Sequence, residues 1–249
     1  YRLLVELENT MWTGAERAAL EDEARAVIER LWRTGEVYLE KPTVEDERAN
    51  VLYYLTGVFP HVLPWVERRL ASAWRRAGFD PALRSDRSAR PRLTFGDWVG
   101  GDRDGHPLVG ADTTQETLEI FRRQALRLQR DALDALAAKL SLSENRHAPP
   151  SDLREWIDAR RDALGPLGAA AVARNPGEPF RQAVNLVAAA LPPTDRPADG
   201  TAYASAASYV ADLRRLRGWM LEVGAHRIAE ADLDPVLDRA ECFGFHLAA

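Results

Sequence analysis

A glycine-rich, charged run at residues 95–107 holds the side chains of this sequence that are best suited to chemistry. It reads Phe-Gly-Asp-Trp-Val-Gly-Gly-Asp-Arg-Asp-Gly-His-Pro. Glycine lets the backbone approach a ligand closely or adopt a positive φ. Such a run suits a loop in which backbone and charged groups face a ligand. Its candidate site residues are Trp98, Gly100, Gly101, Asp102, Arg103, Asp104 and His106.

Several kinds of site fit parts of this run. Asp102 and Asp104 followed by Gly105 suggest a calcium loop, but its other oxygen ligands are missing and Arg103 stands where one is needed. A phosphate-binding P-loop requires Gly-Lys-Ser/Thr, which the run lacks. Two alternatives stay open on the residues alone. One is a tight turn in which Arg103 bridges the two aspartates, and the other is a loop that binds a substrate or an anion.

The elements on either side must position this loop. Residues 92–98 alternate polar and apolar side chains, which predicts a short strand. Thr113 and Glu116 have the spacing of a capping box at the start of a helix. A strand, a glycine-rich loop and a helix, in that order, are typical of the active-site loops of α/β enzymes.

Helical periodicity dominates the sequence before the run. Thr13 and Glu16 predict a capping box for a helix whose apolar residues share one face. An apolar-rich stretch at 51–70 contains Pro60 and Pro64, which we expect to kink or divide a helix because each removes a hydrogen bond.

Helices also dominate the sequence after the run. One long helix is predicted from Thr113 to about Leu140, and Ser151 is predicted to cap the helix that follows. Further helices are expected at 180–191, 202–224 and 233–241, with breaks at 165–179 and 192–200. Residues 243–248 form the second predicted strand.

Composition excludes some classes of function. The net charge of −5 gives no electrostatic basis for binding nucleic acid or an anionic membrane. The single cysteine, Cys242, excludes an internal disulfide and suits a reducing compartment, so we expect a cytoplasmic protein. Cys242 stands beside Phe243 in an apolar stretch, where buried packing is a commoner role than reactive chemistry.

The run at 95–107 resembles the Phe-Gly-Ser-Trp-Met-Gly-Gly-Asp-Arg-Asp-Gly-Asn-Pro signature of phosphoenolpyruvate carboxylase. Other segments resemble the same family in the same order along the chain. They are Leu31–Glu36, Lys41–Glu47, Pro64 with Glu67–Leu70, Glu178–Arg181 and Cys242–Phe245. At position 106 the family usually has asparagine, whereas this sequence has His106. Histidine is bulkier than asparagine and carries a proton that titrates at pH ~6.5.

The resemblance implies a mainly α fold, as a helical segment of an (α/β)₈ barrel that has large helical insertions and one or two short barrel strands here. The family's catalytic-histidine motif would lie before Tyr1, and its third barrel strand would continue beyond Ala249. We therefore expect an internal part of such an enzyme. Its predicted divisions are a helical region at 1–91, the strand and active-site loop at 92–112, a helical insertion at 113–242 and the start of a strand at 243–249.

The function implied by the resemblance is that of a lyase. It fixes carbon dioxide by joining phosphoenolpyruvate and bicarbonate into oxaloacetate and phosphate, with Mg²⁺ or Mn²⁺ held by residues outside this chain. The resemblance also implies a homotetramer and places Trp98 at the substrate pocket. With neither the catalytic histidine nor the metal ligands, the chain alone is expected to be inactive. The alternative is a non-catalytic helical binding module derived from the same family.

A sugar-phosphate effector site is implied only in part. Arg181 matches the arginine of the family's Glu-Pro-Tyr-Arg segment and is the one effector residue that can be placed. After Glu36, where the family carries arginines, this sequence reads Val-Tyr-Leu-Glu and offers no cation for a phosphate. We expect weak or absent activation by sugar phosphates.

Overall fold

The mainly α prediction is confirmed. The computed structural model describes residues 2–8, 11–34, 42–84, 87, 93–102, 109–194 and 200–248, and these residues contain helices and turns but no β-strand. The chain divides into two compact units, Tyr1–Thr43 and Val44–Ala249. Among the described helices, none combines the length and the apolar character needed to cross a lipid bilayer.

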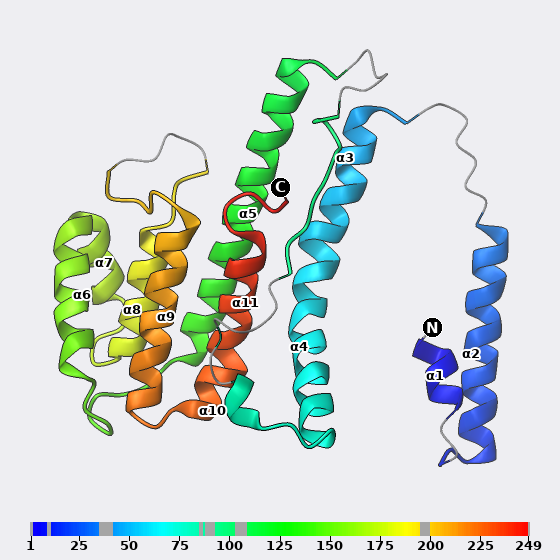
Figure 1. Cartoon of the computed structure of the whole chain (residues 1–249), viewed down its shortest axis with the longest axis horizontal. Coiled ribbons are helices and arrows are strands. Elements are labelled where there is room, and N and C mark those ends of the chain that lie inside the picture. The colour runs from blue at the N-terminus through cyan, green and yellow to red at the C-terminus, as the bar shows by residue number, and fades with distance from the viewer. Residues whose placement is uncertain are drawn as a thin grey trace. The chain divides into compact units, whose positions relative to one another are not determined.

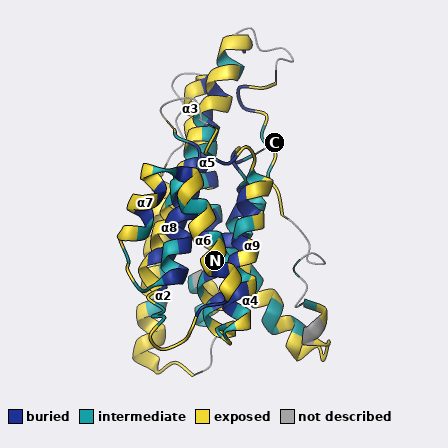
Figure 2. Cartoon of the chain, turned by 90° about the vertical axis from the view of Figure 1, so that its left-hand side faces the viewer, coloured by how far each residue is buried: buried dark blue, intermediate teal, exposed yellow. Residues whose placement is uncertain are grey.

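The first unit consists of α1 (Arg2–Leu7) and α2 (Gly14–Arg33). The predicted capping box is confirmed, because Thr13 Oγ1 accepts a hydrogen bond from the Glu16 amide and Glu16 Oε2 accepts one from the Thr13 amide. No residue of α2 is buried, and the part of this helix that is visible in Figure 2 carries no dark blue. Part of its apolar face, formed by Val27, Ile28 and Leu31, is therefore exposed.

The second unit begins with a long helical rod built from α3 (Val44–Leu52), the π-helical segment η1 (Tyr53–Val58) and α4 (Phe59–Arg76) (Figure 1). The two prolines do not divide it. In an α-helix the Pro60 ring would clash with the carbonyl of the residue four positions earlier, and the wider π-helical turns that end just before it relieve this crowding. Pro64 cannot donate to the Pro60 carbonyl, which instead accepts a hydrogen bond from Arg239 at 3.2 Å.

The rest of the second unit is a helical bundle (Figure 1). Its elements are η2 (Pro81–Arg84), α5 (Ala111–Lys139), α6 (Ser151–Leu164), α7 (Pro166–Ala173), α8 (Pro179–Ala189), α9 (Ala206–Glu222), α10 (His226–Ile228), the π-helical η4 (Ala229–Leu233) and α11 (Asp234–Phe243). The long predicted helix is confirmed as α5. Fully buried leucines from α5, α8, α9 and α11 share one large apolar core, so these helices fix one another by packing.

The predicted break at 165–179 is wrong over much of its length, because α7 occupies Pro166–Ala173. Gly165, at φ 57°, ends α6, and Pro166 then occupies the first turn of α7, where a missing N–H costs nothing. A Cβ on Gly168 would lie 2.4 Å from the Arg161 carbonyl oxygen, so α7 packs close to α6. The glycine and proline that predicted a break instead allow a sharp corner between two helices.

The two predicted strands are also wrong for the described residues. Residues 93–98 have no partner strand, without which an extended segment cannot form a ladder. Phe243 ends α11, and its carbonyl accepts hydrogen bonds from the amides of His246 and Leu247 in a tight turn. Gly244 at φ 51° and Leu247 at φ 66° bend the backbone there, so this segment is a turn.

Two predicted helix caps fail because each predicted capping residue already lies within its helix. Gly110 precedes α5, so Thr113 lies within the first turn and the predicted Thr113–Glu116 box is absent. Pro150 precedes α6, and Ser151 is already helical. Glu116 is free of a capping role and pairs with Arg48 instead.

Candidate active-site loop

The segment 93–102 leads into the glycine-rich loop, and an aromatic stack anchors its start. The Phe95 ring lies between Phe59 of α4 and Phe243 of α11, with ring centroids 4.5 Å and 5.4 Å apart. Both ring pairs are stacked nearly parallel. Aromatic pairs of this kind stabilise beyond the area that they bury, so Phe95 fixes this backbone against two helices.

A compact turn follows around Trp98. Asp97 Oδ1 accepts the Val99 amide at 3.2 Å, and the Trp98 carbonyl accepts the amides of Gly101 and Asp102 at 3.0 Å and 2.9 Å. Burial raises the pKa of Asp97, while hydrogen bonds from the Val99 and Trp98 amides oppose that shift. These bonds hold the backbone of Trp98 while its side chain, 76% exposed, projects into solvent.

The two ends of the loop meet in a small apolar cluster. Val99 and Val109, on either side of the undescribed residues 103–108, are buried together with Val44 in the first turn of α3. Val51 packs against the same cluster. The base of the loop is therefore closed by apolar contacts with α3.

Gly100 fits against α5 so closely that only glycine is compatible with the packing. Its φ is +75°, and an added Cβ would lie 2.3 Å from Thr117 Oγ1 and 2.9 Å from Thr117 Cβ. A side chain at this position would therefore meet both backbone strain and overlap. The turn after Trp98 is seated directly on the Thr117 side chain.

Arg48 also holds the Thr117 side chain. Its guanidinium, in a residue only 7% exposed, donates to Thr117 Oγ1 at 3.2 Å and to Glu116 Oε1 at 3.1 Å. Thr117 Oγ1 in turn donates to the Thr113 carbonyl at 2.8 Å. We call Arg48, Glu116, Thr117 and Gly100 the Arg48 cluster.

The structure places the described candidate residues in different surroundings. Gly100 is buried, whereas Trp98, Gly101 and Asp102 are exposed. The predictions for Arg103, Asp104 and His106 concern residues outside the described part of the chain. Trp98, Gly100, Gly101 and Asp102 are adjacent along one anchored turn, and their role at a substrate pocket stays a prediction.

Arg181, the predicted effector residue, lies away from this loop in α8. It donates to Ser141 Oγ at 3.0 Å and to Glu178 at 3.1 Å, so its charge already has a carboxylate partner. Residues 35–41, which include the segment after Glu36, lie outside the described residues. The effector prediction stays a prediction.

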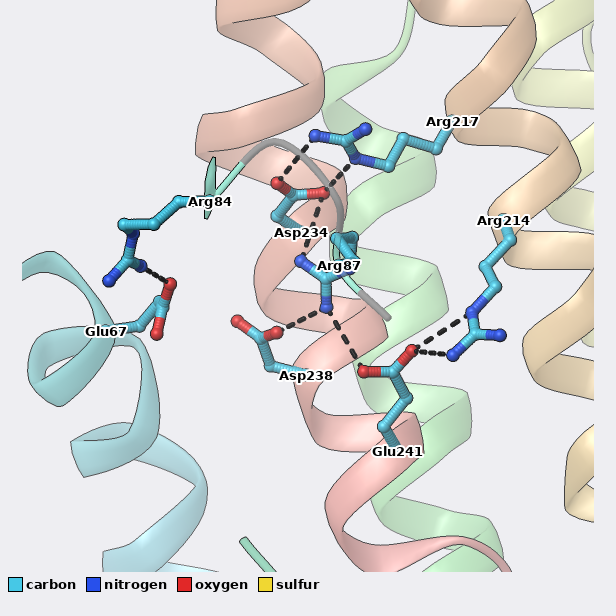
Figure 3. Close-up of polar contacts among 8 residues, drawn as sticks. All are labelled: Glu67, Arg84, Arg87, Arg214, Arg217, Asp234, Asp238 and Glu241. Carbon is cyan, nitrogen blue, oxygen red and sulfur yellow. Dashed lines mark hydrogen bonds and ion pairs between the residues drawn. The ribbon is translucent and has the colours of Figure 1, made fainter. Parts of the chain in front are cut away.

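A second buried arginine lies in a much more highly charged environment (Figure 3). Arg87 points between Asp234, Asp238 and Glu241, which follow one another along one face of α11. Arg217 binds Asp234 at 2.7 Å and Arg214 binds Glu241 at 2.7 Å, both from α9. We call these six residues the Arg87 network.

A cavity of about 810 Å³ lies beside this network, lined by residues of α4, η2 and α9 to α11. Two ion pairs of its wall, Glu67–Arg84 and Arg217–Asp234, are already formed. No group of three or more His, Cys, Asp or Glu side chains among the described residues has the arrangement needed for a metal ion.

The family model described as phosphoenolpyruvate carboxylase matches residues 1–249, the whole chain. The chain belongs to the phosphoenolpyruvate carboxylase family. It is 35% identical to the phosphoenolpyruvate carboxylase of Methylorubrum extorquens over 98% of its own length and 27% of that protein. The corresponding enzyme of Xanthomonas campestris pv. campestris (strain ATCC 33913) is 36% identical over 98% of this chain and 26% of its own length. For that of Thermus thermophilus, the values are 34%, 90% and 23%.

The chain thus spans about a quarter of the length of these phosphoenolpyruvate carboxylases. The residues that sequence analysis missed are Arg48 and Thr117, which support the loop from two helices. A signal for Arg48 exists in the sequence, because it stands between Val44 and Val51 at helical spacing on an otherwise apolar face. Thr117 carries no such signal, since in the sequence it is one residue of a long amphipathic helix.

Proposed function

We propose that this chain is part of a phosphoenolpyruvate carboxylase, which converts phosphoenolpyruvate and bicarbonate into oxaloacetate and phosphate. Family membership over the whole chain supports this. The proposal includes the barrel context, the homotetramer and the cytoplasmic location that the resemblance implies. It also includes the inactivity of the chain by itself, because the family's catalytic histidine and metal ligands would lie outside it.

One observation carries the role of the loop in this proposal. Trp98 is a large aromatic side chain that is 76% exposed, although the backbone around it is anchored by Phe95, Val99 and Gly100. An indole in water does not contribute the stabilisation that its burial would give. Exposure of an indole on a rigid turn is typical of a side chain that contacts a ligand or another part of the protein.

The proposed chemistry explains what such a side chain does. A phosphoryl group passes from phosphoenolpyruvate to bicarbonate, which leaves carboxyphosphate and the enolate of pyruvate. Carboxyphosphate then splits into phosphate and carbon dioxide, and the enolate carbon attacks that carbon dioxide to form oxaloacetate. Water that reaches the enolate protonates it to pyruvate, so the site needs an apolar wall that excludes water. Trp98 supplies part of that wall.

The test is the product ratio of the full-length protein with Mg²⁺, phosphoenolpyruvate and bicarbonate. We expect the wild type to form oxaloacetate, measured with malate dehydrogenase, and Trp98→Ala to lose ~10²-fold in that rate. Pyruvate, measured with lactate dehydrogenase, should make up a larger share of the product in the variant, because the enolate is less protected.

Trp65→Ala is the matched control, since Trp65 is another exposed tryptophan, at 50%, but lies on α4. It should keep the wild-type rate and product ratio. Full activity in Trp98→Ala would show that the Trp98 side chain is not needed for catalysis. A wild type that forms no oxaloacetate would refute the proposed function itself.

A second candidate function, a non-catalytic interaction module, has one observation in its favour. Leu31 and Trp32 at the end of α2 are 74% and 89% exposed, and no residue of this helix is buried. Exposed apolar side chains of this kind serve in contacts with other protein surfaces. Oxaloacetate formation by the full-length protein distinguishes the two candidates, because a module without catalysis forms none.

A further inference from the structure

We propose that Arg48 is a positioning residue for the Trp98 turn, acting through Thr117 and Gly100. The inference rests on the proposed function for the purpose of the turn, but the contacts themselves do not depend on it. Arg48 would touch neither substrate nor product. Its role would be to keep the turn in the one position from which the Trp98 indole can exclude water.

The position of Arg48 on α3 favours this role. Val44, Arg48 and Val51 follow at i, i+4 and i+7, so they lie on one face of the helix. Val44 and Val51 pack against the base of the loop, and Arg48 lies between them. One face of α3 thus contributes both the apolar closure of the loop and the cation that reaches across to α5.

The hydrogen bonds of Thr117 fix its side chain. Its Oγ1 donates its single proton to the Thr113 carbonyl, so the Arg48 guanidinium meets a lone pair of the same oxygen. With both bonds formed, the Thr117 rotamer has one position. Gly100 packs against this oxygen and against Thr117 Cβ, so the rotamer decides how far the turn can approach α5.

The turn passes that constraint on to Trp98. Gly100 stands between Trp98 and the two amides, of Gly101 and Asp102, that bind the Trp98 carbonyl. A displacement of Gly100 therefore strains or breaks both hydrogen bonds. The contacts run without interruption from Arg48 to the backbone of the tryptophan.

Loss of the guanidinium should release the turn locally. Without Arg48, Thr117 keeps only its bond to Thr113, and Glu116, whose side chain is more than half exposed, turns to solvent. Arg48→Lys retains the charge but has one nitrogen, which cannot reproduce the paired contact with Thr117 and Glu116. Arg48→Lys and Arg48→Met should therefore both loosen the turn, and the effect should be larger in Arg48→Met.

The first measurement is hydrogen–deuterium exchange of the full-length protein, followed by mass spectrometry of peptides that cover residues 93–102. We expect the amides of this segment to exchange at least ~10-fold faster in Arg48→Met and Thr117→Val than in the wild type. Thr117→Ser keeps the hydroxyl and should stay close to the wild type. Arg154 lies on α6 and forms an exposed ion pair with Glu144, so Arg154→Met serves as the matched control.

The second measurement is the ratio of pyruvate to oxaloacetate in the same variants. A positioning role predicts that Arg48→Met and Thr117→Val raise this ratio and lower kcat more than they raise KM for phosphoenolpyruvate. A role in stability alone would lower the melting temperature and leave the ratio of products unchanged.

The outcomes separate the two proposals. Unchanged exchange at 93–102 in Arg48→Met would overturn the positioning role, and so would faster exchange with an unchanged product ratio. A wild-type protein that forms no oxaloacetate would overturn the proposed function, and with it the catalytic purpose of the contact, even if exchange at 93–102 responds to Arg48 as expected.

Discussion

Arg48 and Arg87 are both buried arginines of the second unit, but their partners differ. Arg87 lies among three carboxylates, two of which also bind Arg214 or Arg217, so the Arg87 network balances three cations with three anions. Arg48 has one carboxylate, that of the largely exposed Glu116, and its other partner is a neutral hydroxyl.

From this difference we expect Arg87 mainly to stabilise the fold and Arg48 mainly to position the Trp98 turn. Removing one member of a balanced, buried network leaves charges without compensation inside the protein, which costs several kcal/mol. Arg48 has only one, largely exposed, carboxylate partner, so its loss should affect the fold less and the turn that it supports more. The predictions below test this contrast.

The largest effect is expected from Arg87→Met. Asp234, Asp238 and Glu241 would then share two arginines, and the free energy of unfolding should fall by about 3–5 kcal/mol. Urea unfolding of the chain, followed by circular dichroism, measures this. Arg48→Met should lower the same quantity by less, and an equal or greater loss in Arg48→Met would remove the contrast.

The pH dependence of the Arg87→Met effect has a definite sign. Burial raises the pKa of Asp238, and Arg87 opposes that shift, so its removal should raise the pKa further. A carboxyl with a raised pKa in the folded state stabilises fully below its unfolded pKa, and that contribution is lost as pH rises through the folded pKa. Arg87→Met should therefore destabilise more at pH 7 than at pH 4. A constant difference across this range would contradict the account.

A smaller effect is expected from Gly100→Ala, which alters the Arg48 cluster without changing its charges. The positive φ and the overlap with Thr117 should lower the free energy of unfolding by about 2 kcal/mol. Adding Thr117→Ala should recover part of that loss, because Oγ1, the closest overlapping atom, is gone, while the close contact with Thr117 Cβ at 2.9 Å and the backbone strain remain.

Gly218→Ala is the matched control for this substitution. Gly218 lies inside α9 with no atom within 4 Å of an added Cβ, so alanine should stabilise by up to ~1 kcal/mol. Absence of recovery in the Gly100→Ala/Thr117→Ala double variant would mean that the contact between these residues does not limit the turn.

The smallest expected effect is on Cys242, which reports on the Arg87 network without altering it. Burial, together with the nearby charge of Asp238, raises the pKa of the Cys242 thiol to about 11. Alkylation at pH 8 should be roughly 10²-fold slower than in urea, because little thiolate is present. Arg87→Met should speed it at least ~10-fold by opening this region, and Arg48→Met should not. Equal acceleration by both variants would show that the two clusters are not independent.

Local signals in the sequence predicted most of the helices. The long apolar periodicity of α5 and the Thr13–Glu16 capping box sufficed, because both depend on residues close together in the chain. The strand predicted at 92–98 failed for the opposite reason. Alternating side chains describe an extended segment, but a strand also needs a partner, which the sequence of the segment cannot reveal.

The candidate site divides in the same way. The glycine-rich run is conspicuous, and the resemblance to a known family assigned it a function. The contact between the supports of the run could not be predicted, because Arg48 comes 69 residues before Thr117 in the chain. The spacing of Arg48 from Val44 and Val51 indicates an apolar face, but Arg48 also follows three acidic residues, as a charge on a solvated helix would. Only the packing of α3 against α5 shows that this charge is buried.

The π-helical segment η1 sets the rotation of one end of the long helical rod relative to the other. In an α-helix each residue turns the chain by about 100°, so the face that bears Val44 and Arg48 and the face that bears Phe59 are related by the number of residues between them. A π-helical turn holds about one residue more than an α-helical turn, so one residue deleted within Tyr53–Val58 would let the rod close into a regular α-helix and keep Phe59 facing Phe95. One inserted residue would instead rotate Phe59 by about 100° away from Phe95. This segment should therefore tolerate the loss of one residue far better than the gain of one.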